Sequence, residues 1–238
     1  MLEVTDVTKS FGGMTAIYGL SFQVENNQII SIIGPNGAGK TTLFNLISGY
    51  LHPTSGKIFF KGENITNWRP SGICKKGLTR TFQIVQPFMN LNILQNVIIG
   101  ALNWAPTLSE AKDYSLQILE KVKLIDRRDH LANTLTLAGK KRLELARAIA
   151  TKPTLLMLDE VMAGLNKVEG SQLMDLIEKI HTEQKMTILF IEHILNIVMQ
   201  LSNKIIVLNH GSKIAEGTPN EIAQDERTIE AYLGRKRL

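Results

Sequence analysis

The stretch GPNGAGKTT, residues 34–42, constrains the fold more than any other part of this chain. It follows the apolar run IISII and precedes TTLFNLISG, a segment with a helical pattern. Glycines in such a loop let backbone N–H groups curl around phosphate oxygens, and the first turn of the following helix adds partial positive charge. The spacing G-x-x-x-x-G-K-[ST] between a strand and a helix therefore predicts a phosphate-binding loop.

The side chains of this loop have separate expected roles. Lys40 is expected to reach the β- and γ-phosphates of a nucleotide, and the Thr41 hydroxyl is expected to ligate Mg²⁺. The predicted nucleotide contacts are Gly34, Pro35, Asn36, Gly37, Ala38, Gly39, Lys40, Thr41 and Thr42.

The apolar runs indicate the fold class. IISII (29–33), LLML (155–158) and ILFI (188–191) are continuous, and each precedes a polar turn and a helical pattern. Strands buried on both faces that alternate with helices indicate a parallel sheet in an α/β fold. The first 25 residues and GKIFFKG instead alternate apolar with polar side chains, which predicts half-buried antiparallel strands.

Helical spacing dominates from Phe88 to about Ala150, and we expect a helical lobe there. Three further patterns predict amphipathic faces. They are the stripe Leu116, Leu119, Val122 and Ile125, the segment Asn166–Gln184, and a closing helix with Ile229, Tyr232 and Leu233 on one side and Gly234 as its stop.

Two strand ends carry candidate chemistry. LLMLDE ends on Asp159 and Glu160. An acid at the carboxyl end of a buried strand beside a phosphate loop can hold Mg²⁺, which suits Asp159. Glu160 is placed to polarise an attacking water molecule. A solvated strand end is the alternative for the pair alone. ILFIEH ends on His193, and a lone histidine there is more often a surface residue.

Together these elements resemble the ATP-binding cassette ATPases over nearly the whole chain. The motifs of that family match, in order, Phe11, residues 34–42, Gln83 in RTFQ, residues 135–139, Asp159–Glu160, AGLN (163–166) and His193. The resemblance implies a P-loop NTPase core with a parallel sheet, an N-terminal antiparallel β-subdomain and an inserted α-helical subdomain. It also implies ATP and Mg²⁺ as ligands.

The resemblance also gives roles to residues outside the loop. It implies that Phe11 stacks on adenine, although plain core packing is an alternative. It implies that Gln83 ligates Mg²⁺ and couples it to a membrane partner, and that His193 touches the γ-phosphate.

LTLAG (135–139) departs from the family's LSGGQ signature. In the family this stretch contacts the ATP of the opposite subunit in a head-to-tail dimer. Thr136 keeps the hydroxyl and Ala138 keeps the backbone N–H, whereas Leu137 and Gly139 depart further. We expect LTLAG still to close on ATP. The alternative is a degenerate half-site that is kept only as a helix start.

RTFQ, LDEVMAGLN, IEH and the closing GTPNEIAQDERTIEAYLG look most like ATP-binding subunits of branched-chain amino-acid importers. We expect one cassette domain, 1–238. Its expected parts are an antiparallel β-subdomain (about 1–28 and 56–64), a nucleotide-binding core (29–55 and 151–218), a helical subdomain (84–150) and C-terminal helices (219–238).

The expected partners are permease transmembrane subunits and a second cassette, either another copy or a paralogue. A substrate-binding protein would be an indirect partner, since in such importers the cassette never touches the solute. Two other functions stay open at this point: a non-transport cassette protein that acts on ribosomes or DNA, and a weakly hydrolysing regulatory ATP-binding module.

Charge and composition limit the partners and the cellular location that we expect for this protein. The net charge is +5, but Lys75–Lys76, Lys140–Arg142 and Arg235–Arg237 are short and distant, so we interpret most of them as solvated and expect no nucleic-acid partner. No apolar run is long enough to cross a bilayer, the start lacks a secretory signal, and Cys74 is the single cysteine. We expect a cytoplasmic protein at the inner face of the membrane.

Overall fold

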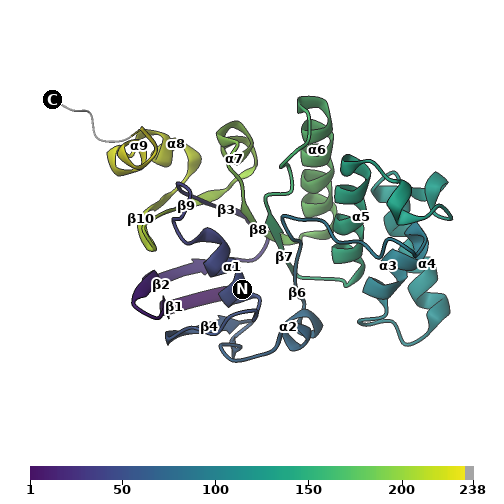
Figure 1. Cartoon of the computed structure of the whole chain (residues 1–238), viewed down its shortest axis with the longest axis horizontal. Coiled ribbons are helices and arrows are strands. Elements are labelled where there is room, and N and C mark those ends of the chain that lie inside the picture. Colours follow the sequence, from purple (N-terminus) through teal and green to yellow (C-terminus); the bar gives the residue numbers. More distant parts are fainter. Residues whose placement is uncertain (234–238) are drawn as a thin grey trace. The chain divides into compact units, whose positions relative to one another are not determined.

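The computed structural model describes residues 1–233, and the chain divides into two compact units. The first joins Met1–Ile73 to Thr187–Leu238, and the second is Cys74–Met186 (Figure 1). The predicted helix stop Gly234 and the basic cluster Arg235–Arg237 lie outside the described residues. In the part that is described, no helix combines the length and the apolar character that crossing a membrane requires.

The first unit contains an antiparallel sheet in the order β2-β1-β4-β5. Its strands are β1 (Leu2–Phe11), β2 (Met14–Val24), β4 (Ser55–Phe60) and β5 (Glu63–Asn64). Leu2 pairs with Val24 on one side and with Phe60 on the other, and all three side chains are buried. The alternation of apolar and polar residues therefore places one face of the sheet in the core, as predicted.

The same unit holds a second, mostly parallel group of strands. β3 (Ile29–Ile33) runs parallel to β8 (Thr187–Ile191) and to β9 (Lys204–Asn209), and β10 (Ser212–Gly217) pairs antiparallel with β9. Every residue of β3 and β8 is buried, as the continuous apolar runs predicted. The helices of this unit are α1 (Lys40–Ile47), α7 (Leu195–Leu201), α8 (Pro219–Gln224) and α9 (Glu226–Leu233), while α2 (Pro70–Lys76) crosses the boundary.

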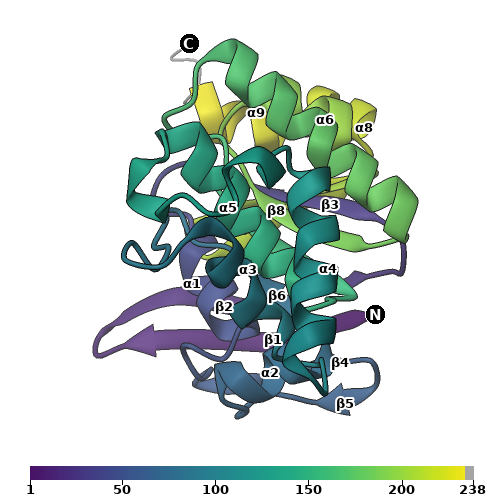
Figure 2. The same cartoon turned by 90° about the vertical axis from the view of Figure 1, so that its right-hand side faces the viewer.

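The second unit is mainly helical. β6 (Leu78–Arg80) pairs parallel with β7 (Leu155–Asp159), and the 3₁₀ turns are Ile125–Arg127 and Ala132–Thr134. Its helices are α3 (Ile93–Ala101), α4 (Leu108–Lys121), α5 (Leu137–Ala150) and α6 (Lys167–Gln184). α3 packs against α4 and α5, and the three teal ribbons lie together in Figure 2. The α/β class, with an antiparallel β part and a helical part, is confirmed.

Two predicted faces differ from the structure. α4 ends at Lys121 and buries Ala111, Ser115 and Ile118 beside Leu119, whereas Leu116 and Ile125 are only half-buried. The closing segment is two helices separated at Asp225, and Ile229 is exposed. Short polar side chains caused the first error, because Ser115 satisfies its own hydroxyl by donating to the Ala111 carbonyl 2.6 Å away.

Candidate active site

The predicted phosphate loop leaves β3 of the first unit through glycines that no other residue could replace. Gly34 has φ +151°, and a Cβ there would lie 2.1 Å from the Leu208 carbonyl oxygen. Gly39 has φ +98°, and its Cβ would lie 2.7 Å from the Ala16 carbonyl oxygen. Both the backbone conformation and the close approach of neighbouring backbone require glycine. The G-x-x-x-x-G spacing is thus a geometric requirement of the turn.

The loop ends at the N-terminus of α1, where Gly39 is the N-cap residue. Within the described residues no side chain caps this helix, so its first-turn N–H groups remain suited to an anion. Lys40 is buried, and its Nζ donates hydrogen bonds to the carbonyl oxygens of Gly34 (2.7 Å) and Pro35 (2.9 Å). A cation, a helix N-terminus and a glycine-rich backbone form a cradle whose chemistry suits a chain of phosphates.

Phe11 and His193 belong to the same unit as the loop. Phe11 ends β1 and is 43% exposed, and the Lys9 ammonium lies 5.0 Å from the centroid of its ring. The core-packing alternative for Phe11 is therefore wrong, and stacking on adenine stays a prediction. His193 is exposed two residues beyond the end of β8, so its contact with a γ-phosphate also stays a prediction.

Gln83 and Glu160 meet in the second unit. The Gln83 Nε2 donates to Glu160 Oε2 at 2.6 Å. Glu160 follows directly on β7 and has φ +48°, a left-handed conformation that a glutamate rarely adopts. Strained backbone of this kind persists only where the surroundings hold it in place, and it is common at functional sites. A carboxylate offers further lone pairs, so Glu160 can accept a proton from water while it holds Gln83.

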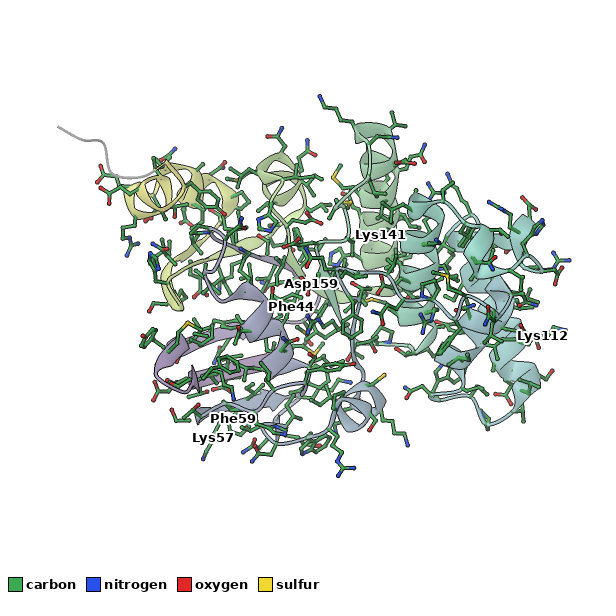
Figure 3. The ribbon with its side chains drawn as sticks, viewed as in Figure 1. Phe44, Lys57, Phe59, Lys112, Lys141 and Asp159 are labelled. Carbon is green, nitrogen blue, oxygen red and sulfur yellow. The ribbon has the colours of Figure 1, made fainter. Side chains whose placement is uncertain are left out.

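Asp159, which Figure 3 labels, is the last residue of β7. It forms an ion pair that sequence reasoning missed. The Arg80 Nη2 lies 2.6 Å from Asp159 Oδ2, and both side chains are buried. Burial of a carboxylate without a partner would be costly, and Arg80 supplies the compensating charge. Little in the sequence indicates this ion pair. It depends on the parallel register of β6 with β7, which puts Arg80 opposite Met157.

Two charged residues of α5 are also buried at this place. Lys141 is 4% exposed and Glu144 is 7% exposed. The interpretation of Lys140–Arg142 as solvated is therefore wrong for Lys141, which Figure 3 labels on its helix. Its Nζ donates to the carbonyl oxygens of Gln83 and Glu160, at 3.2 Å each. Lysine is almost never buried without such partners.

Glu144 accepts the Phe82 N–H at 2.8 Å. The pKa of Glu144 is raised to about 7, mainly by burial and to a smaller extent by nearby Asp159, while the Phe82 N–H, Lys141 and Arg147 oppose the rise. Burial also lowers the pKa of Arg147, while the Glu144 charge raises it. The middle of α5 thus carries a carboxyl group with a pKa near neutrality.

The signature stretch forms the start of α5. Thr136 is the N-cap residue, and its Oγ1 accepts the Gly139 N–H at 3.3 Å. Leu137 is exposed, Ala138 is half-buried, and a Cβ at Gly139 would lie 3.0 Å from a methyl group of Leu135. Thr136 therefore starts the helix. Its hydroxyl accepts one hydrogen bond and can still donate another to a ligand. Closure on ATP stays a prediction for Thr136 and Ala138.

A cavity of about 420 Å³ opens beside the loop that follows β6. The Arg80 guanidinium lies 5.2 Å from the Phe82 ring centroid, and the Arg147 guanidinium lies 4.8 Å from that of Phe88. The lining residues are Thr79, Arg80, Phe82, Gln86, Phe88, Gly100, Glu144, Arg147, Ala148 and Thr151. Phe88 and Met89 are exposed and Leu91 is half-buried, so these three side chains do not form the core of the helical lobe.

Comparison with known proteins gives consistent matches. Residues 17–163 match the family model described as ABC transporter, and residues 212–236 match one described as branched-chain amino acid ATP-binding cassette transporter. The high-affinity branched-chain amino acid transport ATP-binding protein BraF of Pseudomonas aeruginosa is 40% identical, over 98% of both chains. LivG of Salmonella typhimurium, which carries the same description, is 36% identical over 98% of both chains.

Solved structures agree with the sequence matches. A nucleotide-free ATP-binding cassette from an ABC transporter superposes with a TM-score of 0.88, at 30% identity over 99% of both chains. A dimeric cassette in a post-hydrolysis state with ADP and Pi gives a TM-score of 0.82, at 25% identity, and covers 92% of this chain and 99% of that one. The predicted fold, the predicted ATPase class and the suspected family are confirmed. The chain belongs to the ABC transporter family, as one of its ATP-binding cassette subunits.

Proposed function

We propose that this chain hydrolyses ATP to drive a membrane permease that imports branched-chain amino acids or related amides. The proposed solute class rests on the match of residues 212–236 to the branched-chain amino acid family model. These residues lie outside residues 17–163, which match the general ABC transporter model. Full-length likeness to BraF and LivG supports the same class.

The proposed chemistry assigns one task to each group. The loop amides, the N-terminus of α1 and Lys40 bind the phosphates, because all three present positive charge to them. Glu160 polarises the attacking water, and its bond to Gln83 orients the carboxylate. His193 contacts the γ-phosphate and Phe11 stacks on adenine.

Mg²⁺ is the proposed metal cofactor. Thr41, Gln83 and Asp159 offer a hydroxyl, an amide and a carboxylate oxygen, which are the hard donors that Mg²⁺ prefers. In the described residues no group of three or more His, Cys, Asp or Glu side chains could hold a metal, which suits an ion held largely by nucleotide phosphates and water. When bound, Mg²⁺ neutralises charge on the phosphates. Arg80 pairs with the Asp159 carboxylate, and this pairing limits the negative charge left at the site.

We propose that two cassettes, either two copies or this chain and a paralogue, pair head to tail on a permease. Thr136 and Ala138 then contact the ATP of the partner cassette. The dimeric cassette structure at 25% identity supports the pairing of two cassettes. A substrate-binding protein would deliver the solute, and the subunit would lie at the cytoplasmic face of the membrane without contacting nucleic acid. The division into β, core, helical and C-terminal parts is retained as part of this proposal.

Uptake of labelled leucine by cells that lack this chain, complemented together with its permease, tests the proposal. Wild type should restore uptake and ATP hydrolysis. Lys40→Ala should abolish both, because the phosphates lose their buried cation. Lys57→Ala is the matched control, since Lys57 is an exposed lysine of β4 in the same unit. Uptake that does not depend on Lys40, or purification with ribosomes or DNA instead of a permease, would contradict the proposal.

A further inference from the structure

Lys141 occupies an unusual position for a lysine. It lies in the second turn of α5, is nearly fully buried, and donates from one ammonium group to two backbone carbonyls, those of Gln83 and Glu160. Hydrogen bonds from a charged donor are stronger than those between neutral groups, and here the low exposure limits competition from water. One side chain therefore joins the two segments that carry the predicted glutamine and the predicted catalytic acid.

The same two residues also meet through their side chains. Gln83 Nε2 donates to Glu160 Oε2, so the pair is held once at its side chains and once, through Lys141, at its backbone. The second attachment matters for Glu160, whose left-handed backbone is costly for a residue with a Cβ. A hydrogen bond to its carbonyl oxygen helps to fix that peptide, and the fixed backbone limits the directions that the side chain can take.

A second anchor stands one turn further along the helix. Glu144 lies three residues after Lys141, on the same face of α5, and accepts the Phe82 N–H. Phe82 to Leu91 contains no helix or strand, so regular structure does not fix this segment. Two consecutive residues of the loop, Phe82 and Gln83, are thus tied to α5 by one acceptor and one donor.

We propose that Lys141 is a positioning residue for ATP hydrolysis, which holds the Gln83–Glu160 pair so that the Glu160 carboxylate faces the attacking water. The proposal rests on the hydrolytic function proposed above. Lys141 contacts neither ATP nor water in this role and acts only through the backbone of the two residues that it joins. Its loss should lower kcat while ATP binding, which uses the phosphate loop, is retained.

The test measures ATP turnover and ATP affinity of the assembled transporter that carries Lys141→Met, a side chain of similar length without a donor. We expect kcat to fall on the order of 10²-fold, since a misplaced catalytic group loses about that factor. KM and the Kd for ATP should stay near wild type. Lys141→Arg, which keeps charge and donors, should recover most of the loss. Lys140→Met, the half-buried neighbouring lysine, serves as the matched control and should retain activity.

A double-variant cycle separates positioning from a general structural effect. In a Glu160→Gln background, Lys141→Met should change the residual rate by at most about twofold, because the group that it positions is already disabled. If Lys141→Met does not fold, Lys141→Gln is measured by the same criteria. A kcat within about twofold of wild type, or an equal loss in both backgrounds, overturns the inference. A wild-type complex without ATPase activity overturns the proposed function instead.

Discussion

At the scale of single residues, the described site is a set of buried charges that compensate one another. Asp159 pairs with Arg80, Lys141 bonds to backbone carbonyls, and Glu144 lies between cationic neighbours. Each of these charges would destabilise the fold if its partner were removed, since a buried unpaired charge costs several kcal/mol. Substitution of any of these buried charged residues should therefore lower the stability of the second unit.

Glu144 makes stability depend on pH in a predictable direction. Its pKa rises from 4.5 to about 7 on folding, mainly through burial. The groups facing it are Lys141 and Arg147 on α5, Asp159 on β7 and Arg80 on β6. Between these two pKa values the folded state holds a proton that the unfolded state releases. Its contribution to the free energy of unfolding is therefore full below pH 4.5 and falls by ~3 kcal/mol as pH rises through 7.

Urea unfolding of the isolated chain between pH 5 and pH 8 measures this effect. Glu144→Gln keeps an oxygen that accepts the Phe82 N–H but does not titrate. The difference in unfolding free energy, wild type minus Glu144→Gln, should decrease as pH rises and level off above about pH 7. A difference that is constant over the whole range would contradict the raised pKa.

Arg80 and Lys141 show why the sequence predicted only part of the site. The P-loop was predictable because its chemistry is local: a strand, glycines at a tight turn and a helix follow one another along the chain. Arg80 and Lys141 were missed because their partners are distant in sequence and are set by strand register and helix packing. A charged residue that neighbours other charged residues in the sequence, such as Lys141, is predicted to be exposed, and only the packing of the helices shows that it is buried.

At the scale of elements, α5 connects the signature stretch to the acidic strand end. Thr136 caps the helix, Lys141 and Glu144 follow on its buried face, and Trp104 donates from its indole N–H to the carbonyl of Ala150 at the far end, at 2.9 Å. The Lys152 ammonium, just beyond the helix, lies over the Trp104 ring. Both ends of α5 are therefore held by specific contacts.

Substitution of Thr136 tests the two roles of that cap. Thr136→Ala removes the acceptor for the Gly139 N–H and should lower the free energy of unfolding by about 1 kcal/mol. If LTLAG also closes on ATP, the variant should lose turnover in the assembled transporter. Thr136→Ser keeps the hydroxyl and should preserve both properties. Thermal unfolding and ATPase rates measure the two effects separately. Full turnover by Thr136→Ala would favour the degenerate half-site.

At the scale of the whole chain, the pattern of apolar residues in the sequence predicted the strands better than it predicted the buried faces of the helices. β3, β7 and β8 were evident as continuous apolar runs, because strands buried on both faces need no polar residue. The faces of α4 and α9 were less predictable, since Ser115 and Thr228 are buried by satisfying their hydroxyls locally. A pattern of hydrophobic residues does not predict the burial of a polar side chain that forms its hydrogen bond within its own segment.

The measurement that tests the central claim most directly is single-turnover ATP hydrolysis by the assembled transporter that carries Glu160→Gln. The substitution removes the carboxylate charge and retains an oxygen that can accept the Gln83 hydrogen bond. ATP should still bind, and hydrolysis should slow by a factor on the order of 10² to 10⁴, as expected when a general base is lost. Hydrolysis at the wild-type rate, with ATP bound, would contradict the assignment of Glu160 and with it the proposed mechanism.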